Sequence, residues 1–125
     1  MAVDAGGNVY VADGGNARIQ VFSNALALLA VYDTVGSPWA MCITNGAHQY
    51  LFSASNLDRT DNTKGDRAGE IYKLELDGTI VGRLGRSDSA SGTLLTPHFI
   101  SCSGEKELIV VGISDSGQTI TLLPR

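Results

Sequence analysis

Short runs of apolar residues, separated by turn-forming residues, recur along the chain. The first two runs cover residues 9–13 and 18–22, which read VYVAD and RIQVF. Valine, isoleucine, tyrosine and phenylalanine dominate these runs, and such side chains fit the half-buried surface of a β-sheet. The Gly, Asn and Asp residues between the runs tolerate the positive φ angles of tight turns. The pattern therefore predicts antiparallel strands joined by short turns, and no segment has a convincing helical period.

The strand pattern itself repeats three times. Met1 aligns with Met41, 40 positions later, and Met41 aligns with Ile100, 59 positions later, so the second unit carries an insertion. Four antiparallel strands in each 40 to 50 residues are typical of a β-propeller blade. We predict an all-β chain with about three blades. Their expected bounds are about 1–36, about 37–92 with the insertion at 56–68, and about 93–125.

The first unit carries a resemblance to a known repeat. Residues 3–22 read VDAGGNVYVADGGNARIQVF, which closely resembles the NHL repeat of six-bladed propellers. The likeness is weaker in the third unit, where Gly112 and Thr119 replace Asp13 and Arg18. An open stack of three blades exposes two apolar faces, which predicts self-association. We expect a homodimer that completes a ring of six blades, as the resemblance implies, with a nine-bladed homotrimer as the alternative.

Composition and charge exclude several classes of protein. Apolar residues make up 43% of the 125 residues and charged residues 18%, which favours a folded core over disorder. The net charge of −4 and the lack of a Lys/Arg run argue against binding to nucleic acid. The longest apolar run, residues 25–32, is too short for a membrane helix, and the start lacks a secretory pattern. We therefore expect a soluble, cytoplasmic protein.

The two cysteines are predicted to be small buried residues in a reducing compartment. Cys42 aligns with Ser101, whereas Cys102 aligns with Ile43. The two thiols are thus expected on opposite faces of their blades. On this basis the sequence predicts no disulfide within the chain.

The candidate functional residues are predicted to lie at one rim of the expected channel. The first strand of each propeller blade lines that channel, so Pro38–Trp39 and Pro97–His98 should lie at equivalent positions. A neutral histidine is a common metal ligand and a base near neutral pH. His98, repeated by symmetry, is therefore the candidate catalytic residue and metal ligand, and a histidine packed without metal is the alternative. NHL-type lyases that act on amidated peptide precursors hold zinc with inner-strand histidines, so the resemblance implies zinc rather than calcium.

Other polar residues are expected beside this rim. Trp39, Asn56 and Asp58 are the predicted lining of a substrate pocket. The insertion also holds Asp61 and Asp66, but its spacing is not that of a calcium-binding loop, and a solvated loop is the simpler interpretation. Asp13 with Asn16 is expected to fix a turn through hydrogen bonds from side chain to backbone.

Three functions remain open at this point. The first is a metal-dependent hydrolase of phosphotriesters, aryl esters or lactones, with its site in the channel of an oligomeric propeller; propeller enzymes of this kind use a channel-bound cation. The second is a scaffold that binds a ligand or another protein without catalysis. The third is a propeller remnant without an evolved function. Loss of activity in His98→Ala, or with a chelator, would separate the first from the others.

Overall fold

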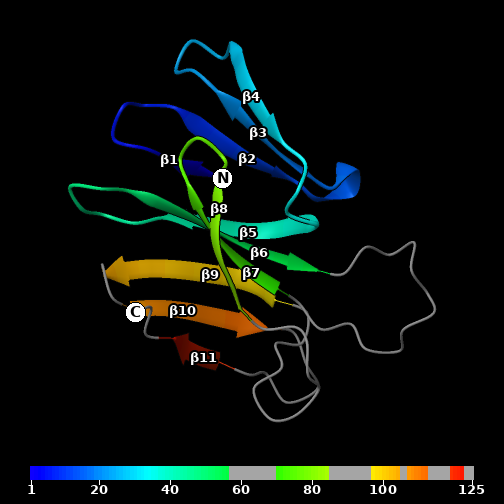
Figure 1. The fold of residues 1–125 in the computed structure, drawn as a ribbon, viewed down its shortest axis with the longest axis vertical. Coiled ribbons are helices and arrows are strands. Elements are labelled where there is room, and N and C mark those ends of the chain that lie inside the picture. The colour runs from blue at the N-terminus through cyan, green and yellow to red at the C-terminus, as the bar shows by residue number, and fades with distance from the viewer. Residues whose placement is uncertain (57–69, 85–96, 105–106, 113–118, 123–125) are drawn as a thin grey trace.

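The computed structural model describes residues 1–56, 70–84, 97–104, 107–112 and 119–122. Their regular structure is β-strand, apart from one 3-10 turn, η1 (Gly14–Asn16). The strands form three antiparallel sheets that follow one another along the chain (Figure 1). The predicted all-β class with propeller blades is thereby confirmed. In these ranges no helix has the length and apolar character needed to cross a membrane.

The three sheets are termed blades 1, 2 and 3. Blade 1 contains β1 (Ala2–Val3), β2 (Val9–Asp13), β3 (Arg18–Phe22) and β4 (Leu28–Tyr32). Blade 2 contains β5 (Ser37–Ile43), β6 (Tyr50–Asn56), β7 (Glu70–Glu75) and β8 (Ile80–Leu84). Blade 3 contains β9 (Pro97–Gly104), β10 (Glu107–Gly112) and β11 (Thr119–Leu122). In each sheet, strands adjacent in the sequence pair with one another.

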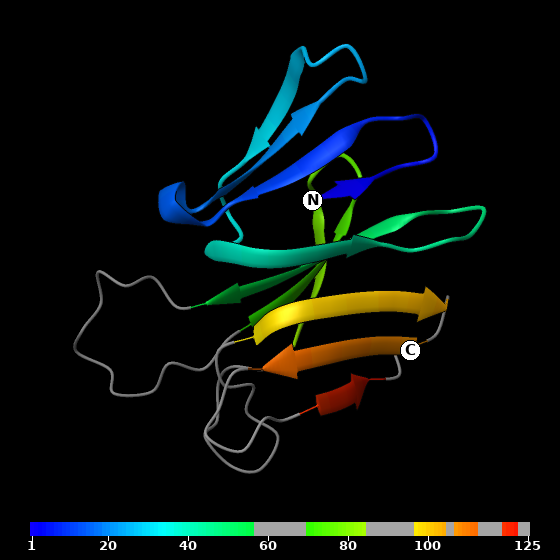
Figure 2. The same cartoon turned by 180° about the vertical axis from the view of Figure 1, so that it is seen from behind.

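Blade 2 lies between the other two blades, as both views show (Figures 1 and 2). Both faces of blade 2 are therefore covered by a neighbouring blade. Strand residues alternate between the two sides of a sheet, so each face contributes its own set of side chains to a separate core. The core against blade 1 contains Tyr10, Ile19, Val21, Val35, Met41, Leu51, Tyr72 and Leu74. The core against blade 3 contains Phe52, Ala54, Ile71, Ile100 and Cys102.

Blades 1 and 2 are built on the same hydrogen-bond plan. The backbone N–H of Asn8 donates to Asp4 Oδ1 at 2.9 Å, and the backbone N–H of Tyr50 donates to Thr44 Oγ1 at 2.9 Å. The two turns are further closed by N–H groups of Asp4 and Thr44, each 3.0 Å from a carbonyl oxygen across the turn. Asp4 and Thr44 are thus equivalent, and the strands that follow can be matched residue by residue.

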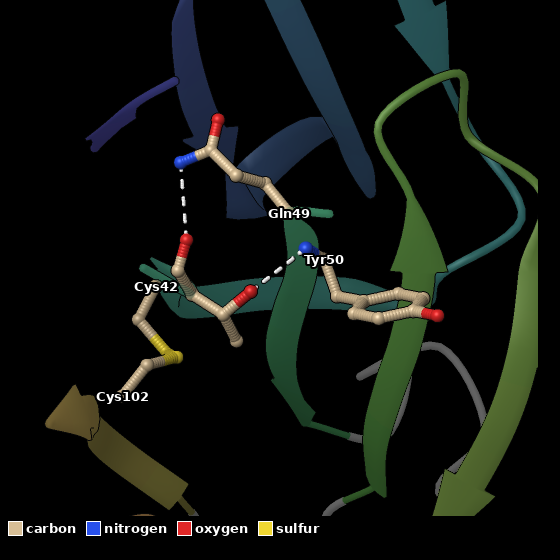
Figure 3. The surroundings of a disulfide bond; sticks show 5 residues. Cys42, Gln49, Tyr50 and Cys102 are labelled. Atoms are coloured by element: carbon tan, nitrogen blue, oxygen red, sulfur yellow. Dashed lines mark hydrogen bonds between the residues drawn. A yellow bond between two sulfur atoms is a disulfide. The ribbon is translucent and has the colours of Figure 1, made fainter. Parts of the chain in front are cut away.

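The prediction that the chain has no disulfide is wrong. Cys42 in β5 and Cys102 in β9 are bonded, with their Cα atoms 5.8 Å apart (Figure 3). The sequence alignment had placed the two residues on opposite faces of their blades, and the cores bear this out: Ile43, the counterpart of Cys102, packs towards blade 1, whereas Cys42 packs towards blade 3. Stacked blades meet through opposite faces, so this arrangement brings the two sulfur atoms together. Because disulfides persist in oxidising compartments, the bond also argues against the reducing compartment assumed for the thiols.

Two tyrosine hydroxyls bind blade 1 to the β7–β8 turn of blade 2. Tyr32 donates to the carbonyl oxygen of Leu76 at 2.6 Å, and Tyr10 lies 3.4 Å from the same oxygen. The Tyr10 hydroxyl also donates to Asp4 Oδ2 at 3.0 Å. Burial, followed by the Asp4 carboxylate, raises the pKa of Tyr10 above its ordinary value, so this hydroxyl keeps its proton at neutral pH.

Candidate functional site

The rim predicted from the sequence begins at two equivalent β-bulges. In β5 the register shifts between Pro38 and Ala40, which makes Trp39 the extra residue of a bulge. In β9 the residue after the first proline, His98, is the extra one in the same way. Such bulges re-aim a side chain. The Trp39 side chain is 39% exposed, whereas the side chain of His98 lies outside the described part of the structure.

The other predicted pocket residues are only partly visible. Asn56 pairs with Ser37 at the end of β6, which places its backbone at the same end of blade 2 as Trp39. Asp58, Asp61 and Asp66 lie outside the described residues. Within the described ranges no group of three or more His, Cys, Asp or Glu side chains could hold a metal ion. The zinc and its ligand His98 therefore stay predictions.

Asp13 organises the β2–β3 turn through side chains. Its carboxylate accepts hydrogen bonds from Asn16 Nδ2, at 3.1 and 3.0 Å, and from Arg18 Nε at 2.9 Å. The expected bonds from the Asp13 side chain to the backbone are absent from this turn. The Asn16 amide and then the Arg18 guanidinium hold the pKa of Asp13 below its usual value, so it is ionised at neutral pH. These bonds engage both carboxylate oxygens in shaping the turn.

A different site emerges when the two faces of blade 1 are compared with those of blade 2. The face of blade 2 that packs on blade 1 carries a cross-strand row, termed the covered row: Ile43, Leu51, Leu74 and Ile80. The matching pairs in blade 1 form the open row: Val3, Val9, Phe22 and Leu28. Because Tyr10 and Ile19 occupy the alternate positions and pack on blade 2, the open row lies on the face turned away from it, termed the open face.

The two rows differ in how far solvent reaches them. Leu51 and Leu74 of the covered row are fully buried, whereas their counterparts Val9 and Phe22 are half-buried. Ile43 and Ile80 are half-buried, whereas their counterparts Val3 and Leu28 are 56% and 55% exposed. Each residue of the open row is thus more exposed than its counterpart, although the side chains are equally apolar. The open face therefore has the chemistry of a core but no neighbour in the described structure.

Comparison with known proteins identifies the segment that builds most of this face. The NHL-repeat family model matches residues 1–22. Blade 1 thus begins with an NHL repeat. No curated protein matches the chain. The NHL repeat supplies three of the four open-row residues, Val3, Val9 and Phe22, and the fourth, Leu28, follows it in β4.

At one left-handed position at the edge of the open face, blade 1 carries a leucine where blade 2 has a glycine. The turns after Phe22 and Leu74 have equal lengths and the same two backbone hydrogen bonds, which makes Leu26 the counterpart of Gly78. Gly78 has φ +96°, and Leu26 has φ 66°. Left-handed backbone is costly for a residue with a side chain, yet Leu26 holds it while 76% exposed.

The sequence analysis predicted an exposed apolar face at each end of the stack but did not identify the residues of the open row, although a signal for them was present. Both alternate sets of positions in β2 are apolar, with Val9 and Val11 on one side and Tyr10 and Ala12 on the other. A strand with water on one face alternates apolar and polar residues, whereas a strand covered on both faces does not. The sequence of the NHL repeat thus indicates two covered faces, of which the described structure covers one.

Proposed function

We propose that the chain is a protein-binding propeller scaffold and that the open face of blade 1 is its binding surface. The observation that carries this proposal is that each open-row residue is more exposed than its counterpart in blade 2. Contiguous exposed apolar patches mark interaction sites in folded proteins. The NHL repeat supports the same function, since NHL repeats generally mediate protein interactions.

The rest of the blade stack suits a scaffold. Cys42 and Cys102 join blades 2 and 3 covalently, and Tyr32 bonds blade 1 to the β7–β8 turn. The open face is therefore held on a stack whose neighbouring blades are fixed to one another. A rigid surface loses little conformational freedom when a partner binds, which favours affinity.

Metal-dependent hydrolysis of phosphotriesters, aryl esters or lactones is the second candidate. The paired bulges at Trp39 and His98 favour it, because β-bulges occur frequently beside active sites. The described residues do not supply a set of metal ligands, and we derive no catalytic step through a metal. The hydrolase, its substrate and its divalent metal remain predictions that activity measurements decide.

One set of variants tests the two functions together. Leu28→Lys alters the open row, and Leu29→Lys is its matched control, because both leucines are 55% exposed. The counterpart of Leu28, Ile80, is half-buried and packs against the core, whereas the counterpart of Leu29, Val81, is 48% exposed in spite of the neighbouring blade. A charge at position 29 should therefore leave the binding surface intact.

The readouts are binding of the apolar dye bis-ANS to dilute protein and hydrolysis of the three ester classes. A scaffold predicts that Leu28→Lys lowers dye binding, that Leu29→Lys does not, and that no hydrolysis depends on His98. Equal dye binding by the wild type and Leu28→Lys would overturn the proposed surface. Hydrolysis that is lost both in His98→Ala and with a chelator would establish the enzyme instead.

A further inference from the structure

We infer that β4, the outer strand of blade 1, pairs with an extended apolar segment of a partner protein, which adds a strand to the sheet. The inference rests on the proposed function and names the kind of partner segment that binds. It starts from the sheet itself. Blade 1 has the strand order β1-β2-β3-β4, so among the described strands β4 is paired on one side only, with β3. Both views show β4 at the outer border of the blade (Figures 1 and 2).

The free edge of β4 is apolar and unprotected. An edge strand presents backbone N–H and C=O groups with which another strand can pair, and folded proteins commonly protect such an edge with charged side chains or proline. Residues 25–32 read ALALLAVY, without a charge, a proline or a glycine. Three side chains of the strand are exposed, with Leu28 and Leu29 at 55% and Val31 at 43%. The edge therefore has the composition of a strand that pairs with another chain.

The outer strand of blade 2 shows how this chain protects the equivalent edge. The β7–β8 and β3–β4 pairings each contain one register shift at the same place. Arg83 of β8 pairs with Tyr72, and its Cζ atom lies 5.4 Å from the centroid of the Tyr72 ring. The equivalent pair in blade 1 is Val31 with Gln20. An exposed valine thus stands in β4 where an exposed arginine guards the edge of β8.

An extended segment is the occupant that satisfies both the backbone and the side chains of this edge. Its backbone continues the antiparallel ladder outward, as β4 continues it from β3. Ala30 and Tyr32 pack against the core towards blade 2, so Val31 between them lies on the open face. Alternate apolar side chains of the added strand would lie beside Val31 and Leu28. Strand addition therefore extends the surface that the proposed function already uses.

Two carboxylates at one end of β4 favour a basic residue in the partner. Asp33 follows Tyr32 directly and is exposed. Asp77 belongs to the β7–β8 turn, to which the Tyr32 hydroxyl is bonded through Leu76. Burial, followed by the charge of Asp77, raises the pKa of Tyr32, so this carboxylate acts on the same end of the strand. In an antiparallel pair, a lysine or arginine at the N-terminal end of the added strand meets these opposite charges.

The probe is the peptide KVTVTV, acetylated at its N-terminus and labelled with a fluorophore at its C-terminus. Fluorescence anisotropy measures its binding to the wild-type chain. Two further peptides carry N-methyl groups on alternate backbone nitrogens, one on the valines and the other on the threonines. Residues of an antiparallel strand alternate in whether they bond a given neighbour. One methylated peptide should therefore bind at least about tenfold more weakly than the probe, and the other should bind like the probe.

A matched pair of variants tests whether β4 is the edge that binds. Val31→Arg gives β4 the side chain that β8 carries at the equivalent position, where the fold already accepts it. It should weaken binding of the probe at least about tenfold, because its charge opposes an added strand and repels the lysine of the probe. Val81→Arg is the control, since Val81 is 48% exposed on the outer strand of blade 2. It should change binding by less than about twofold.

The charge of the partner is tested with a second peptide. EVTVTV, which has glutamate in place of the lysine, should bind the wild type about threefold more weakly than the probe. Equal binding of the two peptides would overturn the basic residue at the Tyr32 end.

Other outcomes would overturn the strand pairing. If the wild type does not bind the probe while Leu28→Lys still lowers bis-ANS binding, the strand pairing fails and the proposed surface stands. Methylated peptides that bind alike would exclude a ladder on one edge, and equal binding by the wild type and Val31→Arg would exclude β4. Wild-type dimers that Val31→Arg abolishes, without binding of the probe, would assign the edge to a second copy. Dye binding that Leu28→Lys leaves unchanged would refute the proposed function, on which the inference rests.

Discussion

Reduction of the Cys42–Cys102 disulfide should remove a large share of the stability of the chain. The bond joins residues 60 positions apart, and closing a loop of this length in the unfolded chain is worth about 4 kcal/mol. Domains of this size are stable by only about 5–15 kcal/mol. Cys102 is 8% exposed and packs in the core between blades 2 and 3. Its apolar contacts persist after reduction, so the lost constraint should dominate the effect.

The assay is urea unfolding with and without a phosphine reductant, followed by the fluorescence of Trp39, the single tryptophan. The free energy of unfolding falls by about 1–3 kcal/mol per M of urea, so the loss on reduction should lower the unfolding midpoint by more than about 1 M. A thiol assay on denatured protein should count no free thiol before reduction and two after it.

The double variant Cys42→Ser/Cys102→Ser serves as the control for this prediction. It should unfold near the midpoint of the reduced wild type, and the reductant should not change it further. Equal midpoints for oxidised and reduced wild type would refute the reasoning. Two free thiols in the native, unreduced protein would refute the bond itself.

Five further substitutions test individual positions. A Cβ at Gly14 would lie 2.7 Å from the carbonyl oxygen of Pro38, so Gly14→Ala should destabilise the chain by about 1–3 kcal/mol in urea unfolding. Gly15, whose Cβ would meet nothing within 4 Å, should change stability by less than about 0.5 kcal/mol when replaced by Ala. Tyr32→Phe should cost about 1 kcal/mol, measured in the same way, because it removes the bond to the β7–β8 turn. Leu26→Gly should raise the stability of the chain by about 1 kcal/mol in urea unfolding, since it relieves the left-handed backbone. The pKa of Asp13 is lowered, so the stability that its carboxylate contributes is complete above the ordinary pKa of 3.8 and is lost as the pH falls through the lowered pKa. The melting temperature of the wild type should therefore fall more steeply in acid than that of Asp13→Asn.

The strands and their grouping into blades could be predicted from the sequence because their signals are local. Alternating β-branched and aromatic residues in 9–13 and 18–22 mark strands, and the turns between them carry Gly, Asn and Asp. The equivalence of Trp39 and His98 was equally visible, since a proline precedes each residue. The β-bulges that these two residues share follow from strand pairing, which becomes visible only when the sheets are assembled.

Contacts between blades could not be predicted in the same way. The alignment placed Cys42 and Cys102 on opposite faces, but the conclusion that they stay apart ignored how blades stack. The residues of the open row were not identified for a related reason, although an exposed apolar face at the end of the stack was predicted. The residues of the open row are as apolar as those of the covered row. The two rows differ only in whether another blade packs on them, and this depends on how the blades stack.

Binding of bis-ANS to the wild-type chain, Leu28→Lys and Leu29→Lys, measured by a fluorescence titration of dilute protein, tests the central claim most directly. A binding surface on the open face predicts that Leu28→Lys binds less dye than the wild type, whereas Leu29→Lys binds as much as the wild type. Equal dye binding by all three proteins would contradict the account, because a charge at Leu28, which is 55% exposed in the open row, should weaken an apolar binding surface.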